Sequence, residues 1–317
     1  MKKLTTSISH FKNKHIIVIG DVMLDRFIIG TVDRISPEAP VPVVSKKEEV
    51  VTLGGAGNVA NNIVALGAKV SLFGVIGKDA SGKVVQKLIE KTKNIQNELT
   101  VSARYVTTDK TRIVSHGQHM VRIDTEELVH LSEKDEEQIL SRYKALLKKT
   151  EVVILSDYMK GMFSEMFVKK LITLAHDREV KVVVDTKPRH SHFFKGAYCI
   201  KPNKKEALLM SFEKDVPRIA KDIATKLHTN VLITLGEEGM YIFEKGKGYQ
   251  IATKAKRIFD VVGAGDTVIA VLALMLTDKK VTLVDAANVA NHAAGIVVSK
   301  RGTATVTQKE LLDSLKD

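Results

Sequence analysis

The chain has one cysteine, no tryptophan, and no apolar run of the roughly 18 residues that a membrane-spanning helix requires. Because Cys199 is the one cysteine, it has no partner for an internal disulfide. It lies in an apolar stretch and is expected to be a small core residue. The first residues lack the apolar centre of a secretory signal. We therefore expect a cytoplasmic protein with no membrane partner.

Further absences narrow the choice of ligand. The 10 histidines show no HExxH or paired spacing, which argues against a histidine-bound metal. Lys and Arg exceed Asp and Glu by 12 (49 against 37), and this favours anionic ligands in general. The basic residues are scattered, without the interleaved aromatics that single-strand nucleic-acid binders use for stacking. Solvated surface is the favoured interpretation, and we expect no nucleic-acid partner; a basic nucleic-acid-binding regulator is the alternative from another class.

What is present is an ordinary globular composition, with 44% hydrophobic and 27% charged residues. Length alone allows two domains, but one large α/β domain with an appendage fits as well. Apolar runs at residues 15–19, 151–155, 180–184 and 230–235 alternate with helical periods and predict a largely parallel sheet. The first run ends at Gly20-Asp21 without a GxGxxG motif, which argues against a dinucleotide fold.

The most informative stretch is residues 260–267, which join two glycines and a carboxylate to a long apolar run. The run predicts a buried helix, and the amides of a helix N-terminus form an anion site. Asp266 beside such amides suggests a base that takes a proton from an attacking hydroxyl, which indicates phosphoryl transfer. The alternative is a glycine turn with Asp266 as a helix cap.

Polar residues follow several predicted strands. Asp157, Asp185 and Asn203 each come at a strand end, and parallel strands share one edge of the sheet, so the three side chains are candidates to line one crevice. Each is equally interpretable as a helix cap or turn residue. Asp21 and Asp25, after the first strand, are candidates to bind sugar hydroxyls or are surface turn residues.

Two glycine-rich stretches are further candidates for binding. Glycines at residues 54–57 open a helix that carries Asn58, so backbone and amide groups can approach a polyhydroxyl ligand; the alternative is a hinge before a tightly packed helix. Thr234, Gly236 and Gly239 form a second candidate phosphate loop.

A small β-sheet lid is expected from two separate segments. Residues 27–45 carry three prolines between short β-rich flanks, as suits an edge strand or a flap. Short strands are predicted at residues 103–106, 111–115 and 120–124, with a hairpin turn at residues 116–118. Arg34, Arg112 and Arg122 would face either the site or water.

Taken together, these motifs resemble a known family. The stretch GGAGNVA at residues 54–60, with Gly67 and Gly77, resembles the amino-terminal signature of the ribokinase (PfkB) carbohydrate kinases, and residues 260–266 resemble their carboxyl-terminal signature. Val271 stands where the general pattern has Ala or Gly. The similarity extends from about residue 15 to residue 306.

Within that family, the chain most resembles the D-glycero-D-manno-heptose 7-phosphate kinases. The resemblance rests on GDVMLDR (20–26), RISPEAPVPV (34–43), SDYMKG (156–161) and GDTVI (265–269). Thr186 replaces the proline usual after Asp185, and Gly57 stands where Ala is common, but neither change removes a functional group. Since many such kinases are fused to a nucleotidyltransferase domain, a chain ending at Asp317 resembles the stand-alone kinase or a kinase half.

The resemblance implies roles for individual residues. Asp266 would deprotonate the sugar O1, with Gly263, Ala264 and Gly265 as the anion hole. Nucleotide-side residues would be Asn203 and Glu206, organising Mg²⁺ through water, the Thr234, Gly236 and Gly239 phosphate loop, and Asn288 and Asn291 beside the adenine. Sugar-side residues would be Asp21, Asp25, Gly54, Gly55 and Asn58, with Asp157 and Asp185 in the same crevice. Because a dianion needs cations within reach, Arg34, Arg112, Lys160 and Lys187 are the candidates for the 7-phosphate.

The same resemblance implies the fold and the reaction. We expect residues 1–317 to form one domain with a three-layer ribokinase-like α/β core, a mostly parallel central sheet, and lid segments at about 27–47 and 103–124 through which a homodimer forms. The enzyme would use ATP and Mg²⁺ to convert D-glycero-D-manno-heptose 7-phosphate into the 1,7-bisphosphate, for lipopolysaccharide or other surface glycans. Activation by K⁺ is left open, and a kinase for another sugar or sugar phosphate is the nearest alternative.

Overall fold

The apolar runs predicted as strands form the centre of the molecule. The computed structural model describes residues 2–255, 257–300 and 302–316, and within them nine strands make one sheet. In sheet order these are β15 (Lys247–Ile251), β14 (Met240–Glu244), β13 (Asn230–Thr234), β12 (Cys199–Ile200), β11 (Lys181–Asp185), β10 (Val152–Ser156), β1 (His15–Gly20), β4 (Lys69–Phe73) and β6 (Ile95–Asn97). Among these strands only β14 pairs antiparallel, with β13 on one side and β15 on the other, so the sheet is mostly parallel, as expected.

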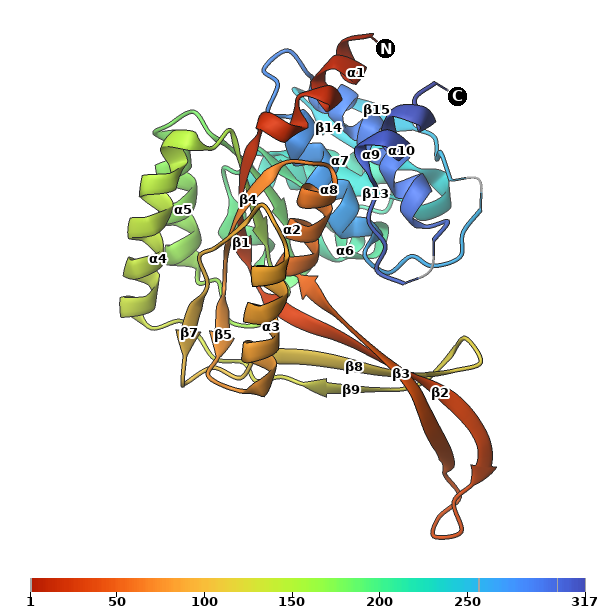
Figure 1. Cartoon of the computed structure of the whole chain (residues 1–317). Helices are drawn as coiled ribbons and strands as arrows, with labels where there is room; N and C mark the ends of the chain where they lie inside the picture. The colour runs from red at the N-terminus through yellow and green to blue at the C-terminus, as the bar shows by residue number, and fades with distance from the viewer. Residues whose placement is uncertain (1, 256, 301, 317) are drawn as a thin grey trace.

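Helices cover both faces of this sheet, because its strands are apolar on both sides. In β1, Ile16 and Val18 belong to one buried cluster, while Ile17 and Ile19 belong to the other. The first face is covered by α1 (Lys2–Ser9), α2 (Ala56–Ala65), α3 (Ala80–Lys91), α8 (Ala264–Met275), α9 (Leu283–Val297) and α10 (Gln308–Ser314). The second is covered by α4 (Glu133–Leu146), α5 (Glu165–His176), α6 (Lys204–Met210) and α7 (Val216–Leu227). The expected three-layer α/β core is confirmed (Figure 1).

A second sheet projects from the core. It has the order β3-β2-β8-β9 and is called the lid sheet below; its strands are β2 (Val22–Ile35), β3 (Pro42–Gly55), β8 (Thr108–Ser115) and β9 (Gln118–Thr125). Figure 1 shows it extending away from the layered core, with the tip of the β2–β3 hairpin reaching farthest. The predicted turn at residues 116–118 is the β8–β9 hairpin turn, at His116 and Gly117.

Two details of the lid differ from the prediction. Residues 103–106 are a turn and irregular chain instead of a strand, because pairing stops at β7 (Thr100–Ser102), which joins β5 (Val75–Gly77). The proline-rich segment is the connection between two long strands, where Pro37 and Pro40 lie in the turn and Pro42 begins the edge strand β3. A strand's first residue is one of the few sheet positions that tolerate proline.

Other expectations hold. Cys199 is buried on β12. Every residue of α8 from Asp266 to Met275 is buried, as its apolar sequence predicts. No helix in the described part of the chain is long and apolar enough to cross a membrane.

Candidate active site

Asp266 lies in the first turn of α8, at a helix start shaped by Gly263. Gly263 has φ +80°, a left-handed conformation that favours glycine, and a Cβ there would lie 3.0 Å from the Asn58 amide nitrogen. The amides of Gly263 and Gly265 donate to no acceptor among the described residues, while the Ala264 amide donates to the Val261 carbonyl at 3.3 Å. Free amides at a helix N-terminus can bind an anion.

Two hydrogen bonds orient the Asp266 carboxylate. The Asn58 Nδ2 donates to Oδ2 at 2.7 Å, and the Tyr158 hydroxyl donates to Oδ1 at 2.6 Å. Burial raises the pKa of Asp266 to about 6, although both hydrogen bonds oppose that rise. The carboxylate is therefore ionised near neutral pH yet basic enough to accept a proton.

Helix α2 supplies the scaffold for this contact. Asn58 and Asn62 lie one turn apart, and Asn62 donates to the Asn58 carbonyl at 2.9 Å while accepting from the Thr267 hydroxyl at 2.8 Å. Asn58 and Asn62 thus bind the first turn of α8 inside an otherwise apolar interface. Gly55 precedes α2, and at Gly54 a Cβ would lie 2.3 Å from Asp25 Oδ2, so only glycine permits this approach.

Asp266 faces a cavity of about 730 Å³. Eleven predicted site residues besides Asp266 line its wall: Asp185, Lys187, Asn203, Glu206, Thr234, Gly236, Gly239, Gly263, Ala264, Gly265 and Asn291. The remaining wall is largely apolar, from Leu235, Met240, Ile258, Val261, Ala294 and Val298. A cavity lined by both polar and apolar residues suits a ligand that has charged groups and a flat apolar group.

Asn203 and Glu206 form a capping box at the start of α6. Asn203 Oδ1 accepts from the Glu206 amide at 2.9 Å, and Glu206 Oε2 accepts from the Asn203 amide at 2.9 Å. Glu206 Oε1 accepts from Lys187 Nζ at 2.7 Å. Both Glu206 oxygens are therefore engaged.

These contacts bear on the metal that such a site would use. Among the described residues there is no group of three or more His, Cys, Asp or Glu side chains that could hold a metal ion. Mg²⁺ keeps much of its water shell and is often bound by substrate phosphates with few protein ligands. Asn203 and Glu206 therefore fit a metal contacted through water better than one ligated directly.

Lys201 and Tyr158 were not among the predicted site residues, although both line the cavity. Lys201 is 3% exposed, its Nζ lies 2.9 Å from Asp185 Oδ2, and a Cβ at Gly265 would lie 3.4 Å from that nitrogen. Burial alone would lower the pKa of Lys201, but the pairing with Asp185 raises it, so the ammonium stays charged. A fixed cation therefore lies beside the amides of α8.

Two predicted carboxylates hold loops together. Asp21 accepts from the amides of Tyr158 at 2.7 Å and Lys160 at 3.1 Å, and burial together with the Asp157 charge raises its pKa to about 7. Asp157 accepts from the Thr186 hydroxyl at 2.7 Å and from His190 Nδ1 at 3.0 Å. Thr186 thus makes a hydrogen bond that the proline usual at its position lacks. Asp21 positions Tyr158 and through it Asp266.

The four basic residues predicted to bind the 7-phosphate of the sugar do not lie together. Arg34 is exposed near the tip of the β2–β3 hairpin, and Lys187 lies in the cavity with Glu206. Arg112 pairs with Asp25 at 2.5 Å, and Lys160 pairs with Glu126 at 2.7 Å. Arg122, whose orientation was open, is exposed and pairs with Asp124.

Asn288 and Asn291, which were predicted to lie together beside the adenine, make different contacts. Its amide donates to the Val284 carbonyl of its own helix at 3.0 Å, whereas Asn291 reaches the Ala252 carbonyl at 2.7 Å and lines the cavity. Of the two asparagines on α9, Asn291 therefore contacts the segment that follows β15.

A signal for Tyr158 and Lys201 exists in the sequence. Tyr158 is two residues beyond the end of β10, and Lys201 is the residue after β12. They occupy the same edge of the sheet as Asp157 and Asp185, where parallel strands deliver functional groups. The rule that selected the acidic and amide residues applies equally to these two side chains.

The chain is similar to several known proteins. The family described as pfkB family carbohydrate kinase matches residues 13–310. The bifunctional protein HldE of Caulobacter sp. (strain K31) is 41% identical over 310 residues, 95% of this chain and 63% of that protein. Seven further proteins of that name are 37–42% identical over 93–99% of this chain. The chain spans less than two thirds of the length of these relatives.

Solved structures share the fold at low identity. A phosphofructokinase-2 from Escherichia coli in complex with potassium has a TM-score of 0.79 at 18% identity, covering 96% of this chain and 98% of that one. The ribokinase of Arabidopsis thaliana, complexed with ribose and ATP, has a TM-score of 0.71 at 19% identity, covering 96% and 99%. The fold is therefore ribokinase-like.

Proposed function

The chain belongs to the pfkB family of carbohydrate kinases, and from that membership we propose that it transfers the γ-phosphoryl group of ATP to O1 of D-glycero-D-manno-heptose 7-phosphate. The similarity to bifunctional proteins HldE supports this choice within the sugar kinases, as do the four sequence motifs that resemble heptose 7-phosphate kinases. The product would be the 1,7-bisphosphate, and its use would be the synthesis of activated heptose for surface glycans.

One observation carries the proposal: the Asp266 carboxylate lies between two hydrogen-bond donors at the start of α8 and faces a cavity that suits a nucleotide. In the proposed reaction, Asp266 accepts the proton of the sugar O1 as O1 bonds to the γ-phosphorus. The bond from that phosphorus to the bridging oxygen breaks, and ADP leaves. The amides of Gly263 and Gly265 and the Lys201 ammonium would stabilise the charge on the transferring group.

The other parts of the cavity have supporting roles in this proposal. Thr234, Gly236 and Gly239 would contact the nucleotide phosphates, and the apolar wall with Asn291 would hold the adenine. Asn203 and Glu206 would hold Mg²⁺ through water, and the ion would neutralise phosphate charge. K⁺ is a further candidate, which the potassium complex of the phosphofructokinase-2 supports by analogy. Closure of the lid sheet would exclude water, which competes with O1 for the phosphoryl group.

A substrate panel tests the proposed function. We expect ADP release, followed in a coupled assay, to have the highest kcat/KM with heptose 7-phosphate among hexose, heptose and pentose phosphates and the free sugars. NMR of the product should place the new phosphate on C1 and identify the anomer. A clear preference for fructose 6-phosphate or ribose would replace this function with that of another sugar kinase.

The homodimer stays a proposal. It is supported by exposed apolar side chains on the lid strands, namely Ile29, Ile35, Val50, Met120, Val121 and Ile123. Light scattering on the same purified protein measures its mass, and a monomer at every concentration would contradict dimerisation.

Replacing Tyr158 with Phe is expected to move the acidic limb of the rate profile to higher pH. Asp266 must be ionised to accept a proton, and the Tyr158 hydroxyl holds its pKa down from the level that burial sets. Without that donor the pKa rises above about 6, so activity declines at a higher pH as the solution is acidified. The measurement is kcat/KM between pH 5 and 9, the range around the pKa values involved.

Tyr143→Phe is the matched control for this change. Tyr143 is also buried and donates its hydroxyl to the Leu171 carbonyl at 3.1 Å, within the α4–α5 layer. Loss of the Tyr143 hydroxyl should leave the acidic limb of the rate profile at its wild-type pH. An unshifted limb in Tyr158→Phe would show that the hydroxyl does not set the protonation of Asp266.

A further inference from the structure

One face of the lid sheet carries charged side chains in register. Asp25 on β2 lies opposite Lys110 on β8, and Lys110 lies opposite Asp124 on β9. Arg112 is two residues beyond Lys110 and lies opposite Arg122. Because alternate residues of a strand share a face, these five side chains lie on one side of the sheet, called the inner face below.

The inner face begins beside the catalytic carboxylate. Asp25 packs against Gly54, and the two glycines that end β3 lead directly into α2, whose Asn58 donates to Asp266. The Asp25 charge is also close enough to contribute to the raised pKa of Tyr158, after burial and the charges of Asp266 and Asp185. From Asp25, the face continues outward by one strand, about 4.8 Å, to Lys110 and by a second to β9.

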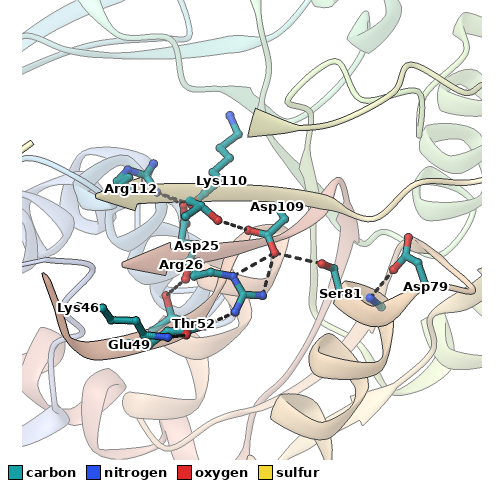
Figure 2. Close-up of polar contacts among 12 residues, drawn as sticks. Asp25, Arg26, Lys46, Glu49, Thr52, Asp79, Ser81, Asp109, Lys110 and Arg112 are labelled. Carbon is teal, nitrogen blue, oxygen red and sulfur yellow. Dashed lines mark hydrogen bonds and ion pairs between the residues drawn. The ribbon is translucent and has the colours of Figure 1, made fainter. Parts of the chain in front are cut away.

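Lys110 differs from the other cations near this face. Arg112 pairs with Asp25, Arg122 with Asp124, and Lys160 with Glu126. The half-buried Lys110 ammonium makes no hydrogen bond or ion pair with any residue that the structure describes. Figure 2 shows its side chain extending away from the sheet. Burial lowers its pKa most, the positive charges of Lys160 and Arg122 lower it further, and the nearby Glu126 and Asp124 carboxylates only partly oppose this shift. A half-buried cation in this state is stabilised by an anion.

The opposite face of the same strands shows what a purely structural network looks like here. Arg26 pairs with Asp109 and Glu49, Asp109 accepts from the Ser81 hydroxyl of α3 at 3.0 Å, and Glu49 also pairs with Lys46 (Figure 2). Every charge in that network has a partner, and the network ties the lid sheet to α3. Lys110 has no such structural task.

We propose that Lys110 binds the phosphate group of the phosphorylated sugar whose reacting hydroxyl lies at Asp266, and so selects sugar phosphates over free sugars. The inference rests on the proposed sugar-phosphate kinase activity and gives its phosphate a place on the inner face. Arg112 and Arg122 lie next to that place, two residues along their strands from Lys110 and Asp124, while Arg34 and Lys187 lie outside it. The ligand class is a phosphate monoester dianion, which Lys binds through charge-assisted hydrogen bonds.

The test compares Lys110→Gln with Lys47→Gln, which removes the same charge from an exposed position on β3 of the same sheet. For whichever sugar phosphate the wild type uses best, Lys110→Gln should raise KM about tenfold or more, the usual scale for a lost charged hydrogen bond. The KM for ATP should stay within about twofold of the wild-type value, because the lysine lies away from the nucleotide cavity. Lys47→Gln should change neither constant.

Two added measurements make the outcomes distinct. Lys110→Arg should recover part of the lost affinity, and inorganic phosphate, tested as a competitive inhibitor against the sugar phosphate, should bind more weakly to Lys110→Gln. An unchanged KM in Lys110→Gln, with an active wild type, overturns the inference and leaves the proposed function standing. A wild type that prefers unphosphorylated sugars overturns both.

Discussion

Asp266→Asn is expected to reduce turnover by a factor of about 100 or more while folding and ATP binding stay near normal, since general-base catalysis typically contributes 100-fold to 10,000-fold. The asparagine has the shape of the aspartate and can still accept the Tyr158 hydroxyl, but it cannot take a proton from the sugar. The free amides at the start of α8 remain, so the anion site persists. The measurements are kcat with saturating substrates, ATP affinity by calorimetry, and the midpoint of chemical unfolding.

A control variant removes a hydrogen-bonded carboxylate outside the proposed site. Asp278→Asn removes a carboxylate that likewise accepts from a hydroxyl, that of Ser7 at 2.7 Å, and does not line the cavity of Asp266. It should keep full turnover. Wild-type turnover in a correctly folded Asp266→Asn variant would remove the proposed mechanism.

Much of the architecture is readable from the sequence because it depends on local patterns. The apolar runs of β1, β10, β11 and β13 lie at or within two residues of their predicted limits. Continuous apolar sequence is what a strand buried on both faces requires. The predicted strand at residues 103–106 does not form. Whether such a short segment pairs depends on which strand lies next to it in the fold, and its composition does not determine this.

The site could be predicted only in part. Asp266 and its glycines are adjacent in sequence, but the partners that orient the carboxylate are remote: Asn58 is 208 residues away and Tyr158 is 108. The ion-pair partners of the lysines were equally unpredictable from the sequence. Nothing in the sequence distinguishes Lys187, which pairs with Glu206, from Lys160, which pairs with Glu126, because only the folded chain selects which acid each one meets.

Lys201→Met is expected to cause the second large effect, on stability and turnover together. Lys201 and Asp185 form a buried pair, so removing the lysine leaves an uncompensated carboxylate, and breaking such a pair typically costs about 3–5 kcal/mol of folding free energy. Turnover should also fall about 100-fold, the scale for losing one preorganised electrostatic contact with the transferring group. Chemical unfolding and kcat measure the two effects separately.

Two companion variants show whether Lys201 acts on the reaction or only on the fold. The double variant Lys201→Met with Asp185→Leu removes both charges, so it should recover most of the lost stability, as buried pairs replaced by apolar residues usually do. Asp185→Asn keeps the lysine and an acceptor oxygen, so it should lose less turnover than either variant without Lys201. If the double variant regained wild-type turnover along with stability, Lys201 would serve the fold alone, and the amides of α8 would be left to stabilise the phosphoryl group without its charge.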